Sequence, residues 1–337
     1  MLSEGSSVRA WTFHGGRLST AREAYGHPAE AWLDLSTGIN PHAWPGAQDI
    51  AVDWRGLPDE QELVELARVA AAYFGTEAAH VCALPGSEVG LRLLSHLVPT
   101  AGGLHVVPTY RTHSEVVAEG VDFDPARLSD AAAEGRAILI ANPNNPDGRV
   151  VSPEVLIGLA QRLAGSQGWL VVDEAFADAR PEASVVPHVR NGLPLLVLRS
   201  FGKFFGLAGL RLGFVVGPPE IIARFRRVLG SWPVSTAAQR IGAAAYRDGA
   251  WITDMRITLA AEAAALDAVL ARHGFQPVGD CPLFRLIETD DAAALFDRLA
   301  RQAILTRPFD YNRRWLRLGL PGGAEALDRL DRALAEG

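Results

Sequence analysis

A serine, a lysine and an arginine follow an apolar run at a spacing that could support covalent chemistry on a carbonyl compound. The run at 195–198 is typical of a buried strand, and Ser200, Lys203 and Arg211 come after it in a glycine-rich stretch flanked by phenylalanines. A desolvated lysine has a lowered pKa, and its neutral amine can attack a carbonyl to form a Schiff base. A hydrated surface lysine is the commoner interpretation of a lone loop lysine, and the residues alone leave both open.

Other polar residues come directly after further apolar runs. Asp173 follows the run at 170–172, and a carboxylate at the end of a buried strand is costly unless it is paired. The segment 142–148, Asn-Pro-Asn-Asn-Pro-Asp-Gly, indicates an extended turn. Gly86 and Ser87 precede an apolar helical run, where backbone N–H groups could bind an anion. A simple helix cap is the other interpretation of that pair.

The composition indicates a globular protein rather than a membrane or nucleic-acid-binding protein. Of 337 residues, 48% are hydrophobic and 21% are charged, and the length suggests roughly two domains. The net charge of −7 argues against nucleic acid as a partner, because phosphate backbones require a basic face. Cys82 and Cys281 have neither a disulfide framework nor metal-ligand spacing, so we expect no metal and a reducing, cytoplasmic location. We expect no membrane partner, since no apolar run reaches the length of a membrane span.

Periodic patterns place these residues on alternating strands and helices. Apolar residues recur at helical spacing over 59–75, and Gly75 ends that pattern. The alanine-rich segment 237–272 is strongly helical by propensity. Short strands are expected at 83–84, 104–110, 137–141, 169–174, 303–309 and 315–320.

The lysine segment also resembles a known family. Ser-x-x-Lys, with an arginine eight residues after the lysine inside Gly-Leu-Arg-Leu-Gly, is similar to the cofactor segment of the class I and II aminotransferases, which are fold type I pyridoxal-phosphate enzymes. The turn at 142–148 matches the family motif Asn-Pro-x-Asn-Pro-x-Gly in full. The resemblance implies pyridoxal 5′-phosphate (PLP) as cofactor and an α/β fold. It implies an N-terminal arm with part of the small domain (1–45), a large domain with a mostly parallel sheet flanked by helices (46–233) and a small α+β domain (234–337).

The family assigns roles to residues by their place in these motifs. It implies that Lys203 forms the Schiff base, that Asp173 pairs with the protonated pyridine nitrogen, and that Tyr110 stacks on the ring; these three are the predicted catalytic residues. Asn145 is implied to donate a hydrogen bond to the cofactor O3′ and to border the substrate. The cofactor phosphate is implied to bind at Gly86, Ser87, Glu88, Ser200 and Arg211. Glu174 is expected to be structural or solvated, and the role of His113 stays open.

Two N-terminal segments narrow the resemblance to a subfamily. His-Gly-Gly at 14–16 and Asp-Leu-Ser-Thr-Gly-Ile-Asn-Pro at 34–41 look like the signature of the L-threonine-O-3-phosphate decarboxylases of cobalamin biosynthesis. That resemblance implies that His14, Gly15 and Gly38 border the substrate phosphate. It also implies that Arg307 and Arg317 bind the substrate's carboxylate and phosphate, with the assignment between the two arginines left open.

Two departures and two alternatives accompany this hypothesis. Leu57 and Phe176 stand where many family members carry tyrosines, one of which reaches the partner subunit. The alternatives are an aminotransferase of the histidinol-phosphate type and a non-catalytic regulator on the same fold. The complete set of predicted cofactor residues argues against the regulator, as does the expected lack of room for a DNA-binding domain before His14. A small phosphorylated amino acid as substrate, a homodimer and contacts with other cobalamin-biosynthesis enzymes are the expected partners.

Overall fold

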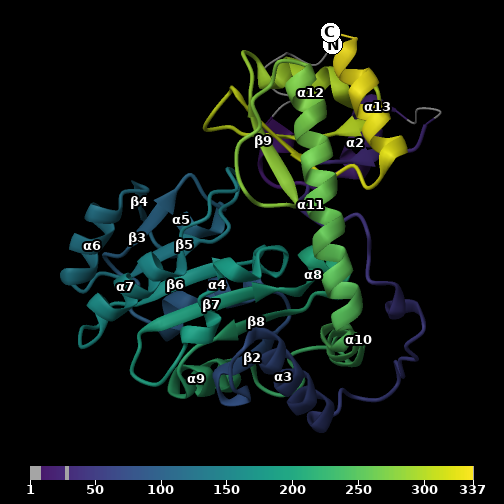
Figure 1. Cartoon of the computed structure of the whole chain (residues 1–337). Helices are drawn as coiled ribbons and strands as arrows, with labels where there is room; N and C mark the ends of the chain where they lie inside the picture. Colours follow the sequence, from purple (N-terminus) through teal and green to yellow (C-terminus); the bar gives the residue numbers. More distant parts are fainter. Residues whose placement is uncertain (1–8, 27–29, 337) are drawn as a thin grey trace. The chain divides into compact units, whose positions relative to one another are not determined.

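A seven-stranded sheet forms the centre of the larger of two structural units (Figure 1). The computed structural model describes residues 9–26 and 30–336. The larger unit comprises residues 43–145 and 149–254; the smaller unit takes the described residues before 43, residues 146–148 and those from 255 onward. The predicted domain boundaries after residues 45 and 233 stay predictions.

The large sheet confirms the predicted α/β fold with a mostly parallel sheet. Its strand order is β2-β8-β7-β6-β5-β3-β4, and only β8 runs antiparallel to its neighbours. The central strands are buried along almost their whole length, which explains their continuous apolar runs. The strands are β2 (Val81–Leu84), β3 (Leu104–Val107), β4 (Glu119–Asp122), β5 (Ile138–Ala141), β6 (Leu170–Glu174), β7 (Leu195–Ser200) and β8 (Gly213–Val216).

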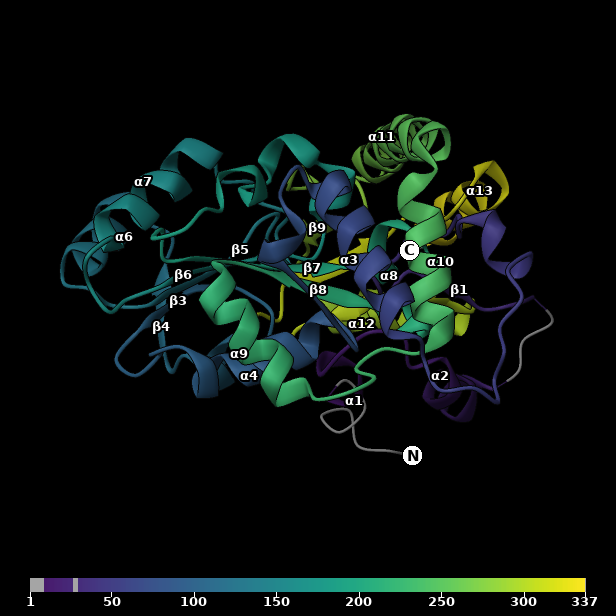
Figure 2. The same cartoon turned by 90° about the horizontal axis from the view of Figure 1, so that it is seen from below.

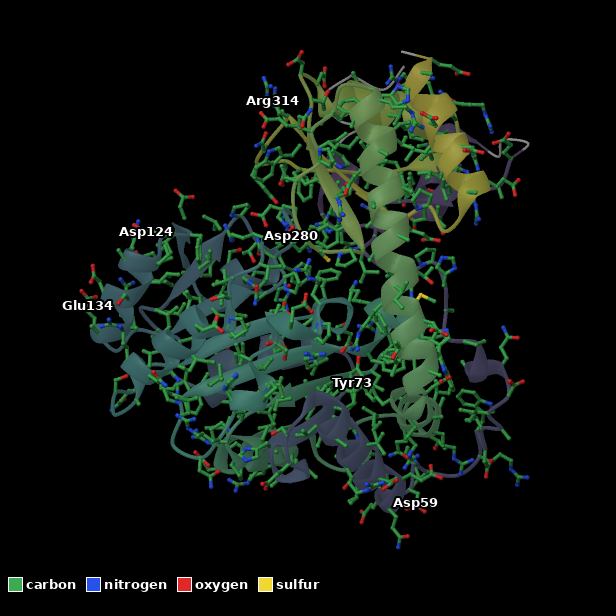
Figure 3. The ribbon with its side chains drawn as sticks, viewed as in Figure 1. Asp59, Tyr73, Asp124, Glu134, Asp280 and Arg314 are labelled. Carbon is green, nitrogen blue, oxygen red and sulfur yellow. The ribbon has the colours of Figure 1, made fainter. Side chains whose placement is uncertain are left out.

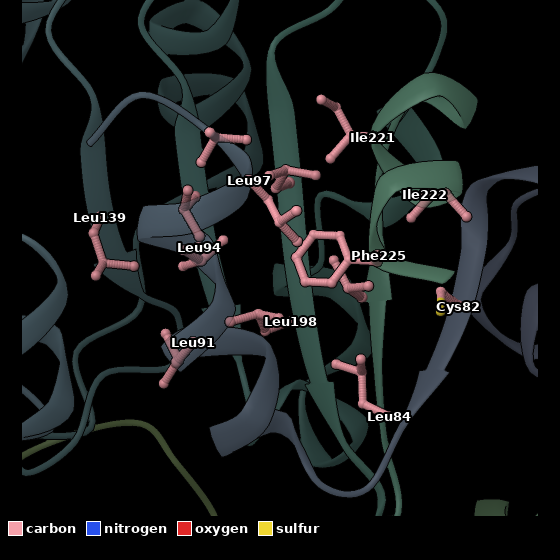
Figure 4. Packing of buried hydrophobic residues seen from close by; sticks show 14 of the residues in the cluster. Cys82, Leu84, Leu91, Leu94, Leu97, Leu139, Leu198, Ile221, Ile222 and Phe225 are labelled. Atoms are coloured by element: carbon pink, nitrogen blue, oxygen red, sulfur yellow. The ribbon is translucent and has the colours of Figure 1, made fainter. Parts of the chain in front are cut away.

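Helices cover both faces of this sheet. On one face, α4 and α9 pack on the strands through a buried cluster in which Leu94 of α4, Leu198 of β7 and Phe225 of α9 take part (Figure 4). Figure 2 shows α7 on the opposite face. The larger unit contains α3 (Glu60–Phe74), α4 (Ser87–Leu97), α5 (Thr112–Val116), α6 (Pro125–Ala133), α7 (Pro153–Leu163), α8 (Phe201–Phe204), α9 (Pro219–Leu229) and α10 (Thr236–Arg247), with short 3₁₀ helices at Pro45–Gln48, Ala78–His80, Ala177–Ala179, Pro181–Ala183, Val186–His188 and Ala208–Leu210.

Helix α3 shows how local sequence sets an element's ends. The carboxylate of Asp59 accepts a hydrogen bond from the Gln61 backbone N–H at 2.6 Å, which caps the first turn. Figure 3 labels Asp59 at this end of the helix. At the other end, Gly75 takes the left-handed conformation with φ 76° and ψ 36°. The helix therefore lies within the predicted range of 59–75.

The alanine-rich segment predicted as one helical stretch contains two helices, α10 and α11 (Gly249–Arg272). Asp248 lies between them in a non-helical conformation. One of its carboxylate oxygens accepts from the Trp251 backbone N–H at 3.1 Å and the other from the Trp44 indole N–H at 3.0 Å. The capping aspartate interrupts the helix where alanine content alone predicts continuity. The unit boundary at residues 254–255 falls within α11.

The smaller unit contains two small sheets. Strands β1 (Leu33–Asp34) and β10 (Ile304–Leu305) pair in parallel, and β11 (Arg307–Pro308), β12 (Trp315–Gly319) and β9 (Phe284–Glu288) form an antiparallel sheet in the order β11-β12-β9. The strand predicted at 303–309 is thus divided at Thr306 between the two sheets. The described helices are α1 (Arg9–Thr12), α2 (Leu18–Tyr25), the C-terminal part of α11, α12 (Ala292–Arg301) and α13 (Ala324–Ala335). No helix in residues 9–26 and 30–336 has both the length and the apolar character needed to cross a membrane.

Candidate active site

Lys203 lies on the short helix α8, directly after the central strand β7. Its side chain is half-buried beside fully buried phenylalanines, and its Nζ lies 5.9 Å from the centre of the Phe176 ring. Lys203 is also the only lysine in the chain; all the other members of its 32 Lys and Arg residues are arginines. Arginine ordinarily keeps its proton near neutral pH, so it does not supply the neutral amine that a Schiff base needs. A single lysine in this apolar setting therefore supports the predicted nucleophile.

The start of α4 and the Arg211 side chain form a cationic cradle. The first N–H groups of this 11-residue helix, beginning at Ser87, have no acceptor within the helix and carry its positive dipole end. Gly86 has φ 94°, and a Cβ there would lie 2.8 Å from Nη2 of Arg211, so the guanidinium lies directly against the glycine. Arg211 itself holds a left-handed φ of 55°. Helix N–H groups and a guanidinium side by side suit a phosphate.

Ser200 lies near the same cradle because of its strand pairing. It pairs with Gly213 across β7 and β8, and a Cβ at Gly213 would collide with the backbone nitrogen of Ser87. The strand end that carries Ser200 thus lies beside the start of α4. The structure brings together four of the residues predicted to bind the cofactor phosphate, namely Gly86, Ser87, Ser200 and Arg211.

Glu88, the fifth predicted phosphate residue, has its carboxylate bound elsewhere. That carboxylate accepts from the Thr112 hydroxyl at 2.9 Å and 3.2 Å and from the Arg92 Nε at 2.9 Å. It also lies near Tyr110, whose pKa is raised by burial first and by Glu88 second. The side chain of Glu88 therefore orients the segment that carries Tyr110, and only its backbone N–H belongs to the start of α4.

Asp173 is held by a fully buried histidine that sequence reasoning left without a role. The Asp173 Oδ2 lies 3.1 Å from Nε2 of His113, and Oδ1 accepts from the Ala175 N–H at 3.2 Å. The other ring nitrogen of His113 is 2.9 Å from the Thr109 hydroxyl. A carboxylate that carries its charge can only accept, so the Nε2–H of His113 is the donor in its contact with Asp173. The Asp173 carboxylate is thereby fixed in orientation at the end of β6.

The Asn-Pro turn divides its asparagines between two tasks. Asn142 is fully buried; its amide donates to the carbonyls of Val151 and Ala183 at 3.0 Å each, and its Oδ1 accepts from the Val151 N–H at 2.8 Å. Asn144, also buried, donates to the Pro108 carbonyl at 2.8 Å. Asn145 is only half-buried. Asn142 and Asn144 fix the loop, and the contact of Asn145 with cofactor and substrate stays a prediction.

The residues of the larger unit fit PLP. A phosphate cradle exists in which two glycines allow the close approach of Arg211 and the start of α4. A buried carboxylate at Asp173 can pair with a ring nitrogen, and a sole lysine can bond to the aldehyde. The described residues contain no group of three or more His, Cys, Asp and Glu side chains that could hold a metal ion.

Two buried arginines lie opposite each other in the smaller unit. Arg307 of β11 and Arg317 of β12 are cross-strand partners and are 7% and 2% exposed. Arg317 donates from Nη2 to the Ser36 carbonyl at 2.7 Å, and Arg307 donates to the Phe13 carbonyl at 3.4 Å. Burial, and then the charge of Arg307, lowers the pKa of Arg317 to about 9. Two buried like charges mark a place suited to an anion.

The N-terminal segments of the predicted signature surround the same arginines. A Cβ at Gly15 would collide with the Ser36 carbonyl, and the Gly16 N–H donates to the Ser36 hydroxyl at 2.7 Å. That hydroxyl donates in turn to Asp34 at 2.5 Å. His14 is exposed, with its Nδ1 3.0 Å from the Gly15 carbonyl oxygen, and Gly38 is buried. The structure thus gathers around Ser36 the two segments that sequence reasoning joined only by resemblance.

Comparisons with known proteins agree with this geometry. Residues 53–334 match the model of the family "Aminotransferase class I and II". The chain is 41% identical to a threonine-phosphate decarboxylase of Sinorhizobium sp over 96% of this chain and 97% of the relative. It is 38% identical to a threonine-phosphate decarboxylase of Pseudomonas aeruginosa over 95% and 96% of the two chains. Among solved structures, histidinol-phosphate aminotransferase from Sinorhizobium meliloti, in complex with pyridoxal-5′-phosphate, has a TM-score of 0.84 at 21% identity, covering 100% of this chain and 98% of that one.

Proposed function

The chain belongs to the class I and II aminotransferase family, and from this membership we propose that it is a PLP-dependent threonine-phosphate decarboxylase. It converts L-threonine O-3-phosphate into (R)-1-amino-2-propanol O-2-phosphate for cobalamin biosynthesis. The observation that carries the proposal is the 41% identity to a decarboxylase of that name over 96% of the chain. The signature segments at 14–16 and 34–41, which contact each other around Ser36, support it.

The residues of the larger unit support the chemistry. When bound, PLP supplies an electron sink for the bond that breaks at the substrate's α-carbon. The cradle of Gly86, Ser87 and Arg211 would hold its phosphate, and Asp173, oriented by His113, would keep its ring nitrogen protonated. Lys203 Nζ would hold the aldehyde before substrate enters. The same amine would be the group that returns a proton to the substrate's α-carbon after CO₂ has left.

The arginines of the smaller unit support the choice of substrate. Threonine phosphate carries a carboxylate and a phosphate, and two buried guanidinium groups provide charge for two anionic groups. We propose that Arg307 and Arg317 bind these groups and that His14, Gly15 and Gly38 border the phosphate. Holding both ends of the substrate sets which bond at the α-carbon is aligned for cleavage, and so selects decarboxylation over transamination.

A single assay tests the reaction. Holoenzyme is incubated with threonine phosphate or with unphosphorylated threonine, in each case with and without 2-oxoglutarate, and released CO₂ is measured. We expect CO₂ from the phosphorylated substrate alone, at a rate that does not depend on the keto acid. Turnover that requires 2-oxoglutarate, with glutamate as product, would assign the chain to the aminotransferase alternative, for which histidinol phosphate is the substrate to test. Absence of the visible band of lysine-bound PLP would favour the non-catalytic regulator.

We further propose a homodimer and a cytoplasmic location. An open groove of about 510 Å³ in the larger unit is lined by apolar side chains that include Leu207, Leu210 and Ile241. Trp54, which lines this groove, is 77% exposed, and Leu57, which does not line it, is 69% exposed. Exposed apolar surface of this kind favours a protein partner, here a second copy. Both cysteines are buried and neither forms a disulfide, in keeping with a reducing compartment. Light scattering of the purified protein tests the dimer.

A further inference from the structure

A buried cluster of three charged side chains lies where β6 and β7 end. Arg199 of β7 is 4% exposed, Glu174 of β6 is fully buried and Asp178 is 1% exposed. The Arg199 Nη1 donates to Glu174 at 2.7 Å, and its Nη2 donates to Asp178. The guanidinium therefore bridges two carboxylates that belong to different segments, the strand β6 and the 3₁₀ helix that follows it.

The cluster is anchored by further hydrogen bonds and by an aromatic ring. Ser184 donates its hydroxyl to Glu174 at 2.6 Å and accepts from Arg199 at 3.2 Å, and the Val185 N–H donates to Glu174 at 2.6 Å. The guanidinium carbon of Arg199 lies 4.7 Å from the centre of the Phe74 ring. Burial opposes the charge of Arg199, but Asp178 and Glu174 raise its pKa overall. Of the two roles expected for Glu174, structural or solvated, the structure shows the structural one.

Such a cluster contributes little to stability compared with apolar residues of similar size. Removing charges from water costs several kcal/mol each, and replacing a buried ion pair by apolar side chains is often neutral or stabilising. A buried triad is better explained by what it holds in place. Two members of the triad are next to proposed cofactor residues in the sequence. Glu174 directly follows Asp173, and Arg199 directly precedes Ser200. In the β6–β7 register, Asp173 pairs with Leu198 and Glu174 pairs with Arg199.

We propose that Arg199 is a positioning residue for the reaction at Lys203, an inference that rests on the proposed function. By binding Glu174, its guanidinium fixes the end of β7 against the end of β6. By binding Asp178, it fixes the segment that follows β6 and carries Phe176. The three segments that bear Asp173, Phe176 and Lys203 are thus tied to one side chain. Two carboxylates on different segments require the planar fork of arginine, because a lysine ammonium is a single point charge on a flexible stem.

The test compares Arg199→Lys with wild-type holoenzyme. Lysine keeps the charge and loses the fork. We expect kcat for threonine-phosphate decarboxylation to fall about 100-fold, because small misplacements of reacting groups have effects of that order. We expect KM to stay within about threefold of the wild-type value, because the proposed substrate-binding arginines lie in the other unit. The visible absorbance band of bound PLP changes as the lysine-bound cofactor titrates, and the pH at the middle of that change, here called the band midpoint, should also differ from the wild-type value. A variant with unchanged kcat and an unchanged band midpoint would overturn the proposal.

A matched control separates positioning from stability. Arg285 is 8% exposed and binds Asp267, whose side chain is 36% exposed, through Nε and Nη2 at 2.6 Å and 3.0 Å. Arg285→Lys therefore removes the fork of another buried arginine. In the β9–β12 register, Arg285 is opposite Leu318 while Arg317 is opposite Leu286, which puts the two arginines on opposite faces of the sheet. We expect the control to lower thermal stability as Arg199→Lys does, with kcat and the band midpoint unchanged. Equal losses of kcat in both variants would overturn the positioning role.

A milder variant covers the case in which Arg199→Lys does not fold. Ser184→Ala removes one hydrogen bond to Glu174 and one from Arg199 without changing any charge. It should lower kcat less than Arg199→Lys and move the band midpoint in the same direction. An unchanged midpoint in Ser184→Ala would overturn the proposal. Failure of the proposed function is distinguishable, because wild-type holoenzyme would then bind PLP and show the visible band without releasing CO₂ from threonine phosphate.

Discussion

Arg307 and Arg317 are directly opposite each other on neighbouring antiparallel strands, with both side chains buried. The pKa of Arg317 is lowered to about 9 by burial and then by Arg307, which shows that the charges oppose each other in the substrate-free protein. Among their contacts, Arg317 donates to the Ser36 carbonyl and Arg307 donates to the Phe13 carbonyl. A bound anion would relieve the repulsion. Loss of one of the two charges should therefore weaken substrate binding and raise the stability of the substrate-free protein.

The variant Arg307→Met should therefore be more stable than wild type in the absence of substrate. Removing one of two buried like charges relieves their repulsion, so the free energy of unfolding should rise by about 1 kcal/mol, which corresponds to roughly one pKa unit. The same change should raise KM for threonine phosphate about 100-fold, because a buried charged contact is lost. Chemical denaturation and steady-state kinetics measure the two effects.

Arg314→Met serves as the control for this variant. Arg314 lies nearby in sequence, is largely exposed and pairs with the exposed Glu288, so its replacement should change stability by less than about 0.5 kcal/mol and leave KM unchanged. If Arg307→Met lowers stability and leaves KM at the wild-type value, the arginine pair is a structural feature and not an anion site.

The lowered pKa of Arg317 predicts how substrate binding depends on pH. The protonated guanidinium binds the anion, so affinity is fully present below the pKa and is lost as pH rises through about 9 in the free enzyme. We expect KM for threonine phosphate to rise above pH 9, with a smaller change in kcat because bound substrate favours the protonated form. In Arg307→Met the rise in KM should shift to higher pH, since the neighbouring charge is gone. An identical KM profile in both proteins would contradict the coupling.

His113 provides a prediction about cofactor binding. Its fully buried ring joins Thr109 to Asp173. His113→Phe removes the donor that orients the carboxylate, so we expect weaker PLP binding and a kcat about tenfold lower, with KM little changed. PLP titration followed by tryptophan fluorescence measures the affinity. The exposed His96 on α4 gives the control His96→Phe, which should match wild type; equal PLP affinity in all three proteins would show that Asp173 needs no such support.

Local signals were sufficient to predict the strands that carry the site. The apolar runs before Asp173 and Lys203 are central strands, and the polar residues directly after them lie where the strands end. Short-range patterns work there because buried parallel strands need continuous apolar sequence. The start of α4 could also be predicted from local sequence, because Gly86 and Ser87 stand between a short strand and an amphipathic helix.

Long-range pairings could not be predicted from the same signals. His113 and Asp173 are 60 residues apart, and Arg199 binds Glu174 and Asp178 across 25 and 21 residues. No periodicity links such positions, because the fold alone brings them together. The break between α10 and α11 escaped prediction for a different reason: Asp248 stops the helix through its contacts with Trp44 and Trp251, whereas propensity counts only the alanines around it.

The sole lysine allows the central assignment to be tested by labelling. Borohydride reduction of the PLP holoenzyme should fix one cofactor per chain, and peptide mass mapping should place it on Lys203, because no other lysine exists to compete. Lys203→Arg keeps the positive charge but cannot bond to the aldehyde or release a proton near neutral pH. It should retain PLP only reversibly, show no visible band of lysine-bound cofactor, and lose decarboxylation by at least about 1000-fold, as expected when nucleophile and proton donor are removed together. Turnover by Lys203→Arg near the wild-type rate, or reduced cofactor found on the N-terminal amine alone, would contradict the role assigned to this residue.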